Sequence, residues 1–134
     1  MTKSIHLSLD AMGGDNAPQI IVDGAAQTKI RHPYVKFSFF GNKIKLLPLI
    51  SSSELLKESE IVHTEEFIDA NEKPSIAVRK GRNSSMGMAI QSVKSGKADA
   101  IVSAGNTGAL MAMAKLFLRP CLLYTSDAAD DSLR

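Results

Sequence analysis

Two stretches of this 134-residue chain each join a strand-like apolar run to a glycine-containing polar turn and then to a helix. In the first, IHLSL is followed by DAMGGDNAP over residues 5–18, and in the second, DAIVS is followed by AGNTGALMA over residues 99–112. A strand that is followed by a crossover helix returns to the sheet in the parallel direction. Because further strand patterns at 35–40 and 60–63 alternate with helical ones, we expect an α/β fold with a mostly parallel sheet.

The pattern also predicts the bounds of the individual elements. Strands are expected over residues 5–9, 35–40, 60–63 and 99–103, and helices over 18–32, from 43 onwards, from Pro74 to Gly81, from a cap at Asn83 or Ser84 to Gly96, and over 105–118. A short turn of helix is expected at 54–59, and residues 64–73 are expected to form a loop. Pro48 is expected to disturb the helix that starts at 43.

The composition indicates one globular domain. Hydrophobic residues make up 44% of the chain and charged residues 22%, which argues against disorder. The net charge of +2 comes from scattered basic residues with few aromatic ones, so nothing favours nucleic-acid binding. No apolar run approaches the length of a membrane span. The apolar stretch near the N-terminus is too short for a signal peptide and reaches an acidic residue too early, so a cytoplasmic location is expected.

Neither the cysteine nor the histidines form a metal-binding pattern. The single cysteine, Cys121, excludes an internal disulfide, and His6, His32 and His63 have no metal-motif spacing, so no metal is expected. Residues 121–134 have no clear strand or helical period and resemble a chance translation of a sequencing-library adaptor. We therefore expect a non-native, disordered tail there and no chemistry from its cysteine.

The turn before the last helix has the composition of an anion site. Gly105 and Gly108 allow backbone amides to approach a ligand closely, and Ser103, Asn106 and Thr107 add hydrogen-bonding side chains. The helix that follows would direct its free N–H groups and the positive end of its dipole at the same place. This stretch fits a phosphate site, and it fits a tight, well-capped turn equally well.

The first turn, DAMGGDNAP, differs because it carries two carboxylates, Asp10 and Asp15. These would repel a bare phosphate unless they orient donors, hold a metal or manage a proton. Asp15 or Asn16 as a helix cap is the alternative interpretation. Neither turn is a GxGxxG fingerprint or a P-loop, so a nucleotide site is not favoured.

A third stretch combines cations with hydroxyl groups at a helix start. Arg79, Lys80 and Arg82 precede Ser84 and Ser85, and together they could grip a phosphate or an acidic partner. The alternative is a solvated basic turn. The methionines that follow are typical of a buried core, although they could also line an acyl channel.

Taken together, three stretches resemble the bacterial phosphate acyltransferases of phospholipid synthesis, the fatty acyl phosphate synthases. They are DAMGGDNAP at 10–18, VRKGRNSSM at 78–86 and ADAIVSAGNTGALMA at 98–112, in the order of the family. The resemblance implies a three-layer α/β/α sandwich like that of phosphotransacetylases and the isopropylmalate dehydrogenase group. Residues 1–120 would be its N-terminal part, and the later half of the family chain would complete the site, so we expect this chain alone to be inactive and poorly stable.

The activity implied by the resemblance is transfer of a long-chain acyl group from acyl carrier protein to inorganic phosphate, giving acyl phosphate. Acyl carrier protein and phosphate would be the partners, and no metal or organic cofactor is expected. The resemblance also implies a homodimer of the full-length protein. It would act in the cytoplasm, with peripheral contact to the inner membrane face and to the downstream glycerol-phosphate acyltransferase.

The resemblance carries over to site residues position by position. The phosphate-cradling turn of the family matches Ser103, Gly105, Asn106, Thr107 and Gly108. Its first site loop matches Asp10, Gly13, Gly14, Asp15 and Asn16. Its basic segment matches Lys80, Ser84 and Ser85, with Arg79 beside them. Asn106, Lys80 and Asp10 are expected to be catalytic and the others to bind phosphate or substrate. Gly81-Arg82 departs from the more lysine-rich form of the family, so less weight falls on Arg82.

The mechanism expected from this resemblance needs no enzyme nucleophile. Phosphate, held by amides of the last turn and by Lys80 or Arg79, would attack the thioester carbonyl directly. Three competing interpretations remain: a phosphotransacetylase that uses short acyl-CoA, a dehydrogenase of the related fold, and a non-catalytic module that binds acyl carrier protein through Arg79, Lys80 and Arg82. The dehydrogenase is disfavoured because no dinucleotide fingerprint occurs.

Overall fold

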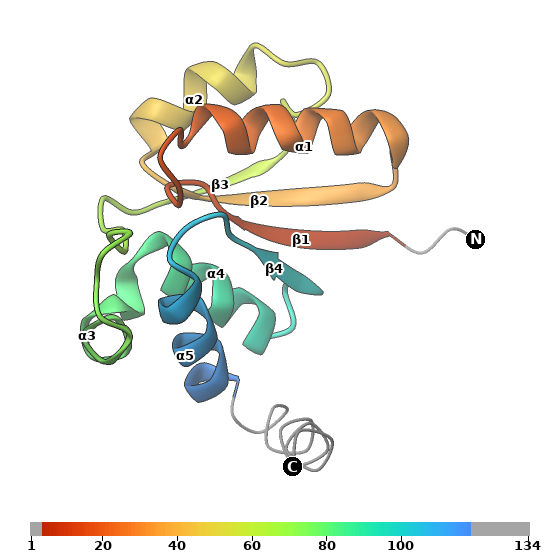
Figure 1. Ribbon diagram of the computed structural model, residues 1–134. Coiled ribbons are helices and arrows are strands. Elements are labelled where there is room, and N and C mark those ends of the chain that lie inside the picture. Colours follow the sequence, from red (N-terminus) through yellow and green to blue (C-terminus); the bar gives the residue numbers. More distant parts are fainter. Residues whose placement is uncertain (1–3, 119–134) are drawn as a thin grey trace.

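A computed structural model describes residues 4–118 of the chain, in which strands and helices alternate (Figure 1). In chain order the elements are β1 (Ile5–Asp10), α1 (Gln19–Arg31), β2 (Val35–Gly41), α2 (Lys43–Ser51), β3 (Glu60–His63), α3 (Pro74–Lys80), the 3-10 turn η1 (Gly81–Asn83), α4 (Ser85–Lys94), β4 (Ala100–Val102) and α5 (Thr107–Phe117). The tail predicted at 121–134 lies outside the described residues.

The sheet is fully parallel, as expected, with the strand order β3-β2-β1-β4. Helices α1 and α2 cover one face of it, and α4 and α5 cover the other (Figure 1). The predicted three-layer α/β/α arrangement is therefore confirmed for this part of the chain. Because all four strands run the same way, the turns that follow β1 and β4 lie side by side at one edge of the sheet (Figure 1).

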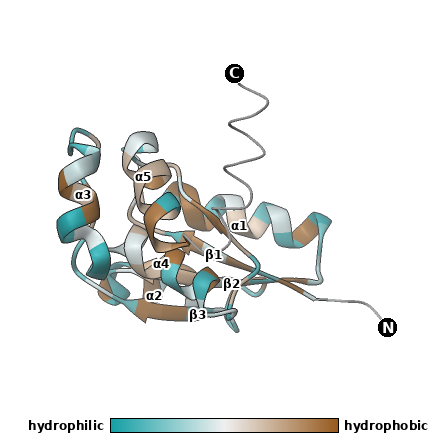
Figure 2. Cartoon of the chain, turned by 90° about the horizontal axis from the view of Figure 1, so that it is seen from below, coloured by the Kyte–Doolittle hydropathy of each residue, from teal (hydrophilic) through white to brown (hydrophobic). Residues whose placement is uncertain are grey.

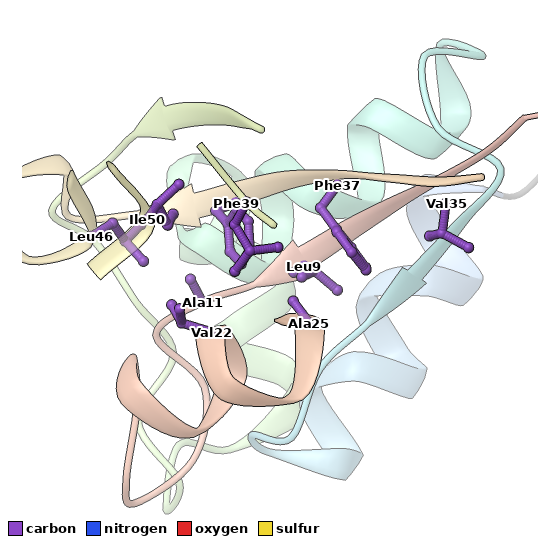
Figure 3. Close-up of a cluster of buried hydrophobic side chains, with 10 residues drawn as sticks. Leu9, Ala11, Val22, Ala25, Val35, Phe37, Phe39, Leu46 and Ile50 are labelled. Carbon is purple, nitrogen blue, oxygen red and sulfur yellow. The ribbon is translucent and has the colours of Figure 1, made fainter. Parts of the chain in front are cut away.

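One hydrophobic core lies between the sheet and the helices α1 and α2. Leu9 of β1 and Phe39 of β2 point towards Val22 and Ala25 of α1 in this core (Figure 3). Phe39 is fully buried. Helix α1 carries both hydrophobic and hydrophilic residues (Figure 2), and of these Val22 and Ala25 are buried against the sheet.

The opposite face of the sheet is covered as well, which buries polar residues of β1. A second core joins α3, α4 and α5 through side chains that include Met86, Ile90 and Met113. Ser8 and Asp10, on the strand face opposite Leu9, are 0% and 2% exposed. Within the described residues the Ser8 hydroxyl has no hydrogen-bond partner, whereas Asp10 has several.

Two local predictions about the helices differ from the structure. Residues 54–59 form hydrogen-bonded turns and no helix. The Leu56 and Lys57 amides both donate to the Ser53 carbonyl, Leu56 is buried in the core, and so short a helix does not repay its nucleation. Neither Asp15 nor Asn16 caps α1 with its side chain, since Pro18 occupies the cap position and the chain reaches it through backbone turns.

Pro48 lies inside α2 without ending it. The Ser84 cap of α4, in contrast, is confirmed, with the Ser84 hydroxyl accepting from the Gly87 amide at 3.0 Å. Nothing in the stretch 4–118 forms a helix of the length and hydropathy needed to cross a bilayer.

Candidate active site

The three sequence stretches that suggested chemistry meet at one buried carboxylate, that of Asp10. Its Oδ1 accepts a hydrogen bond from the Ser85 hydroxyl at 2.6 Å and from the Met12 amide at 3.3 Å. Its Oδ2 accepts from the Ser103 hydroxyl at 2.8 Å. These contacts join the end of β1, the start of α4 and the turn after β4, although Ser85 and Ser103 lie 75 and 93 residues away in the sequence.

Glycine is required where the first and last turns touch. A Cβ atom added to Gly13 would lie 2.6 Å from Asp10 Oδ2 and 3.0 Å from the Gly105 nitrogen. A Cβ atom on Gly105 would lie 3.1 Å from the Gly13 Cα. Gly14 has a φ of +98°, a conformation that other residues rarely adopt, and it lies against the Ala104 backbone. The two turns are therefore in backbone-to-backbone contact beside Asp10.

The hydrogen bonds of Ser85 and Ser103 hold the turns at this junction in position. Each hydroxyl donates its proton to Asp10, and Ser103 Oγ also accepts from the Gly105 amide at 3.2 Å. A hydroxyl group has one proton to donate. In this arrangement Ser85 and Ser103 hold the turns in place, and neither has a proton left for a substrate oxygen.

Asn106 connects α5 to the segment before α3. Its Oδ1 accepts from the Ala109 amide at 3.0 Å and so caps the helix. Its Nδ2 donates to the carbonyl oxygens of Asp69 at 3.1 Å and Glu72 at 2.8 Å. The Asn106 side chain therefore positions the turn, and all of its polar atoms are in use.

The first turn of α5 leaves donors available next to this junction. Among residues 4–118 the amides of Thr107 and Gly108 have no hydrogen-bond partner, and both residues are exposed. The helix has no acidic residue in its first turn that would oppose an anion. Two N–H groups, the Thr107 hydroxyl and the positive end of the helix dipole therefore face solvent at the carboxyl edge of the sheet.

The predicted cations lie apart from the junction. Arg79 and Lys80 are exposed in the last turn of α3, where positive side chains favour the helix dipole. The guanidinium of Arg82 stacks over the Phe117 ring, 4.9 Å from its centroid. The structure thus brings Ser85 of the basic segment to Asp10 and leaves its cations at the surface.

Residues 64–73, expected only to form a loop, cross the site and are called here the crossing segment. The Ser85 amide donates to the Glu66 carbonyl at 2.9 Å, which ties the crossing segment to the start of α4. Part of it, with Phe67 and Asp69, lines a cavity of about 110 Å³ whose other wall includes Gly14 and Gly105. The turn-forming letters DANEKP indicate a loop, but they do not indicate what the loop covers.

The remaining predicted residues have definite places. Asp15 lines the small cavity, Asn16 is exposed, and Gly108 packs against Pro74 at the start of α3. Ser84 is buried as the cap of α4. Across residues 4–118 there is no group of three or more histidine, cysteine or acidic side chains that could hold a metal ion.

These features define a parallel α/β protein whose polar, glycine-containing turns gather at the carboxyl edge of the sheet, where such folds bind ligands. The chain belongs to the family described as fatty acid synthesis protein, which it matches over residues 5–124.

Similar relatives are the phosphate acyltransferases of Parvibaculum lavamentivorans and Rhodospirillum rubrum. The first is 47% identical over 121 residues, and the second is 48% identical over 120 residues. Each alignment covers 89% of this chain and 34% of the relative. A phosphate acyltransferase of Rhizobium leguminosarum bv. trifolii is 50% identical over 117 residues, which is 86% of this chain and again 34% of the relative. The expected kinship is confirmed, and the chain spans about a third of the length of these curated relatives.

Asn106→Ala is expected to lower the free energy of unfolding by about 1–2 kcal/mol, because the helix cap is lost and two carbonyls lose a donor. Asn42→Ala is the matched control, since Asn42 caps α2 through the Ile44 and Lys45 amides and its NH₂ group makes no hydrogen bond to any residue from 4 to 118. Urea unfolding followed by circular dichroism measures both. Equal losses would mean that the bonds to Asp69 and Glu72 contribute nothing.

Proposed function

We propose that this chain carries part of the site of an enzyme that transfers a long-chain acyl group from acyl carrier protein to inorganic phosphate, giving acyl phosphate for phospholipid synthesis. The observation that carries the proposal is the junction at Asp10, which fixes two glycine turns beside the unpartnered amides of α5. The relatives' name, phosphate acyltransferase, supports phosphate as the acceptor and acyl transfer as the class of reaction.

In this proposal phosphate binds at the start of α5. The Thr107 and Gly108 amides and the Thr107 hydroxyl would donate to its oxygens. Asp10 and Asn106 act as positioning residues, because their polar atoms bind protein groups and hold the turn that presents these donors. Arg79, exposed on α3, would attract phosphate or an acidic carrier protein from solution, whereas Lys80, also exposed there, lies among four acidic side chains.

The proposed step is a direct displacement at the thioester carbonyl. A phosphate oxygen forms a bond to the acyl carbon, the carbon–sulfur bond breaks, and the carrier's sulfur leaves as a thiolate that takes up a proton. Negative charge develops on the carbonyl oxygen in between, so N–H donors of the glycine turns would stabilise it. No covalent intermediate on the protein and no cofactor is part of the proposal.

The proposal extends to the setting of the reaction. It includes acyl carrier protein as donor, a homodimer of the full-length protein and a cytoplasmic location. It also includes peripheral contact with the inner membrane face and the downstream glycerol-phosphate acyltransferase. The family membership is the support for these points.

The proposal is tested with a chimera in which residues 5–118 replace the matching part of the Parvibaculum lavamentivorans phosphate acyltransferase. Given phosphate and palmitoyl acyl carrier protein, the chimera is expected to form palmitoyl phosphate, detected by mass spectrometry. A preference for acetyl-CoA would favour a phosphotransacetylase. Binding of the carrier protein without turnover would favour a non-catalytic module, and either result contradicts the proposal.

A further inference from the structure

The crossing segment is held against the site by hydrogen bonds near both of its ends. Near its start, the Thr64 hydroxyl donates to the Asn83 carbonyl at 2.6 Å, just before α4. Near its end, Asn106 binds the carbonyl of Glu72, as described above. Phe67 lies between these contacts, and the bond from the Ser85 amide to the neighbouring Glu66 carbonyl ties its backbone to the start of α4, which reduces the ordering entropy lost on binding.

Phe67 is exposed in spite of this fixed backbone. Its side chain is 58% exposed, whereas the neighbouring Ile68 turns inward and packs over Gly81. Covering a large, exposed apolar side chain with a ligand removes apolar surface from water, which favours binding. Packing within the described residues thus explains why Ile68 points inward. It does not explain why Phe67 points outward.

Two cavities lie on either side of Phe67 and Ile68, which line both of them. The smaller is the cavity of about 110 Å³ that contains Gly14 and Gly105. The larger, of about 410 Å³, has apolar walls at Ile76 and Ala77 of α3. A ligand that passes Phe67 would therefore have one end beside the glycine turns and the other end over α3.

The charges around the larger cavity restrict what this ligand can be. Its lining includes four acidic side chains and one cation, namely Glu65, Glu66, Asp69, Glu72 and Lys80. A free fatty acid or a phosphate group would be repelled there, because like charges at short range disfavour binding. An uncharged apolar chain avoids this repulsion and gains contact with the apolar walls.

We propose that Phe67 is a specificity-determining residue that contacts the apolar acyl chain of the donor beyond the carbons nearest the thioester carbonyl, where the chain passes from the glycine turns to the larger cavity. This inference rests on the proposed function, and it adds the residue that selects long acyl chains over short ones. Phe67 would cover chain carbons that a butyryl group lacks, while the carbonyl lies at the glycine turns.

The test uses the chimera described above, with palmitoyl and butyryl acyl carrier protein as donors. Phe67→Ala is expected to lower kcat/KM about tenfold for the palmitoyl donor and less than twofold for the butyryl donor, since less chain is lost from contact. The KM for phosphate should not change. Phe67→Leu, which stays apolar, should retain most of the preference.

The control is Ile30→Ala, because Ile30 is 66% exposed near the end of α1, where the chain leads to the start of β2 and away from the site. It should change neither donor. An equal loss for both donors, or no loss for the palmitoyl donor, would overturn the role of Phe67. Failure of the unsubstituted chimera to form any acyl phosphate would instead reject the proposed function, so the two failures are distinguishable.

Discussion

Replacing Asp10 by alanine is expected to lower the free energy of unfolding by about 3 kcal/mol or more, the largest single-site loss at the proposed site. The Ser85 and Ser103 hydroxyls and the Met12 amide would all lose their acceptor in a buried place. Each buried donor without a partner costs about 1–3 kcal/mol. Urea unfolding of the chain measures the effect. In the active chimera, the misplaced turns should lower kcat/KM by about 100-fold.

Two variants make this prediction specific to the junction. Asp10→Asn keeps the shape and one accepting oxygen, so about 1 kcal/mol should be lost. Asp99→Ala removes a carboxylate that accepts one exposed bond, from the His6 amide at 2.9 Å, and should cost less than about 1 kcal/mol. If Asp10→Ala destabilised the chain no more than Asp99→Ala does, the buried carboxylate would not be what holds the three segments together.

The fold could be predicted from the sequence because its information is local. The strands at Ile5–Asp10 and Val35–Gly41 combine β-branched, aromatic or alternating apolar residues, with glycine at the end of the second and in the turn after the first, and the helices between them have their own periods. Parallel pairing then follows from connection length alone. The prediction at 54–59 was wrong for the same reason. Two leucines and a lysine favour a helix locally, but the sequence does not show that a turn is enough to bury Leu56 in the core.

The site could be predicted only in part, because its bonds join distant segments. Glycine turns at the ends of two strands indicate a ligand edge, and the structure brings Asp10, Gly13, Ser103 and Gly105 together there. The local sequence does not show that the Ser85 hydroxyl donates to Asp10. It also does not show that the cations of the same segment stay at the surface. The exposed positions of Arg79 and Lys80 follow from where α3 packs, which is a tertiary property.

The crossing segment and the polar face of β1 were missed for related reasons. Alternation such as that of IHLSL is typical of a strand with one face in water, yet here α4 covers the polar face and buries Ser8. The segment around Phe67 has no period at all, so its place above the glycine turns depends on bonds to Ser85 and Asn106. The burial of Ser8 and the placement of Phe67 depend on tertiary contacts, which the local composition does not encode.

Gly87→Ala is expected to destabilise the chain by more than about 3 kcal/mol, although Gly87 and Gly24 look alike in sequence as glycines inside helices. A Cβ atom on Gly87 would lie 2.0 Å from the Gly81 carbonyl oxygen and 2.8 Å from that of Arg82, so backbone would have to move. Gly24→Ala is the matched control, because no atom lies within 4 Å of its added Cβ, and it should stabilise α1 by about 0.5–1 kcal/mol.

The consequence of the Gly87 change would reach the site. Ser84 caps α4 at the Gly87 amide, and Ser85 follows it directly, so a displaced helix start would lengthen the 2.6 Å bond to Asp10. Urea unfolding gives the stability, and amide hydrogen exchange of Met12 and Gly105 reports the junction, where exchange should become faster. A Gly87→Ala chain as stable and as protected as the Gly24→Ala chain would show that η1 does not pack against α4 as described.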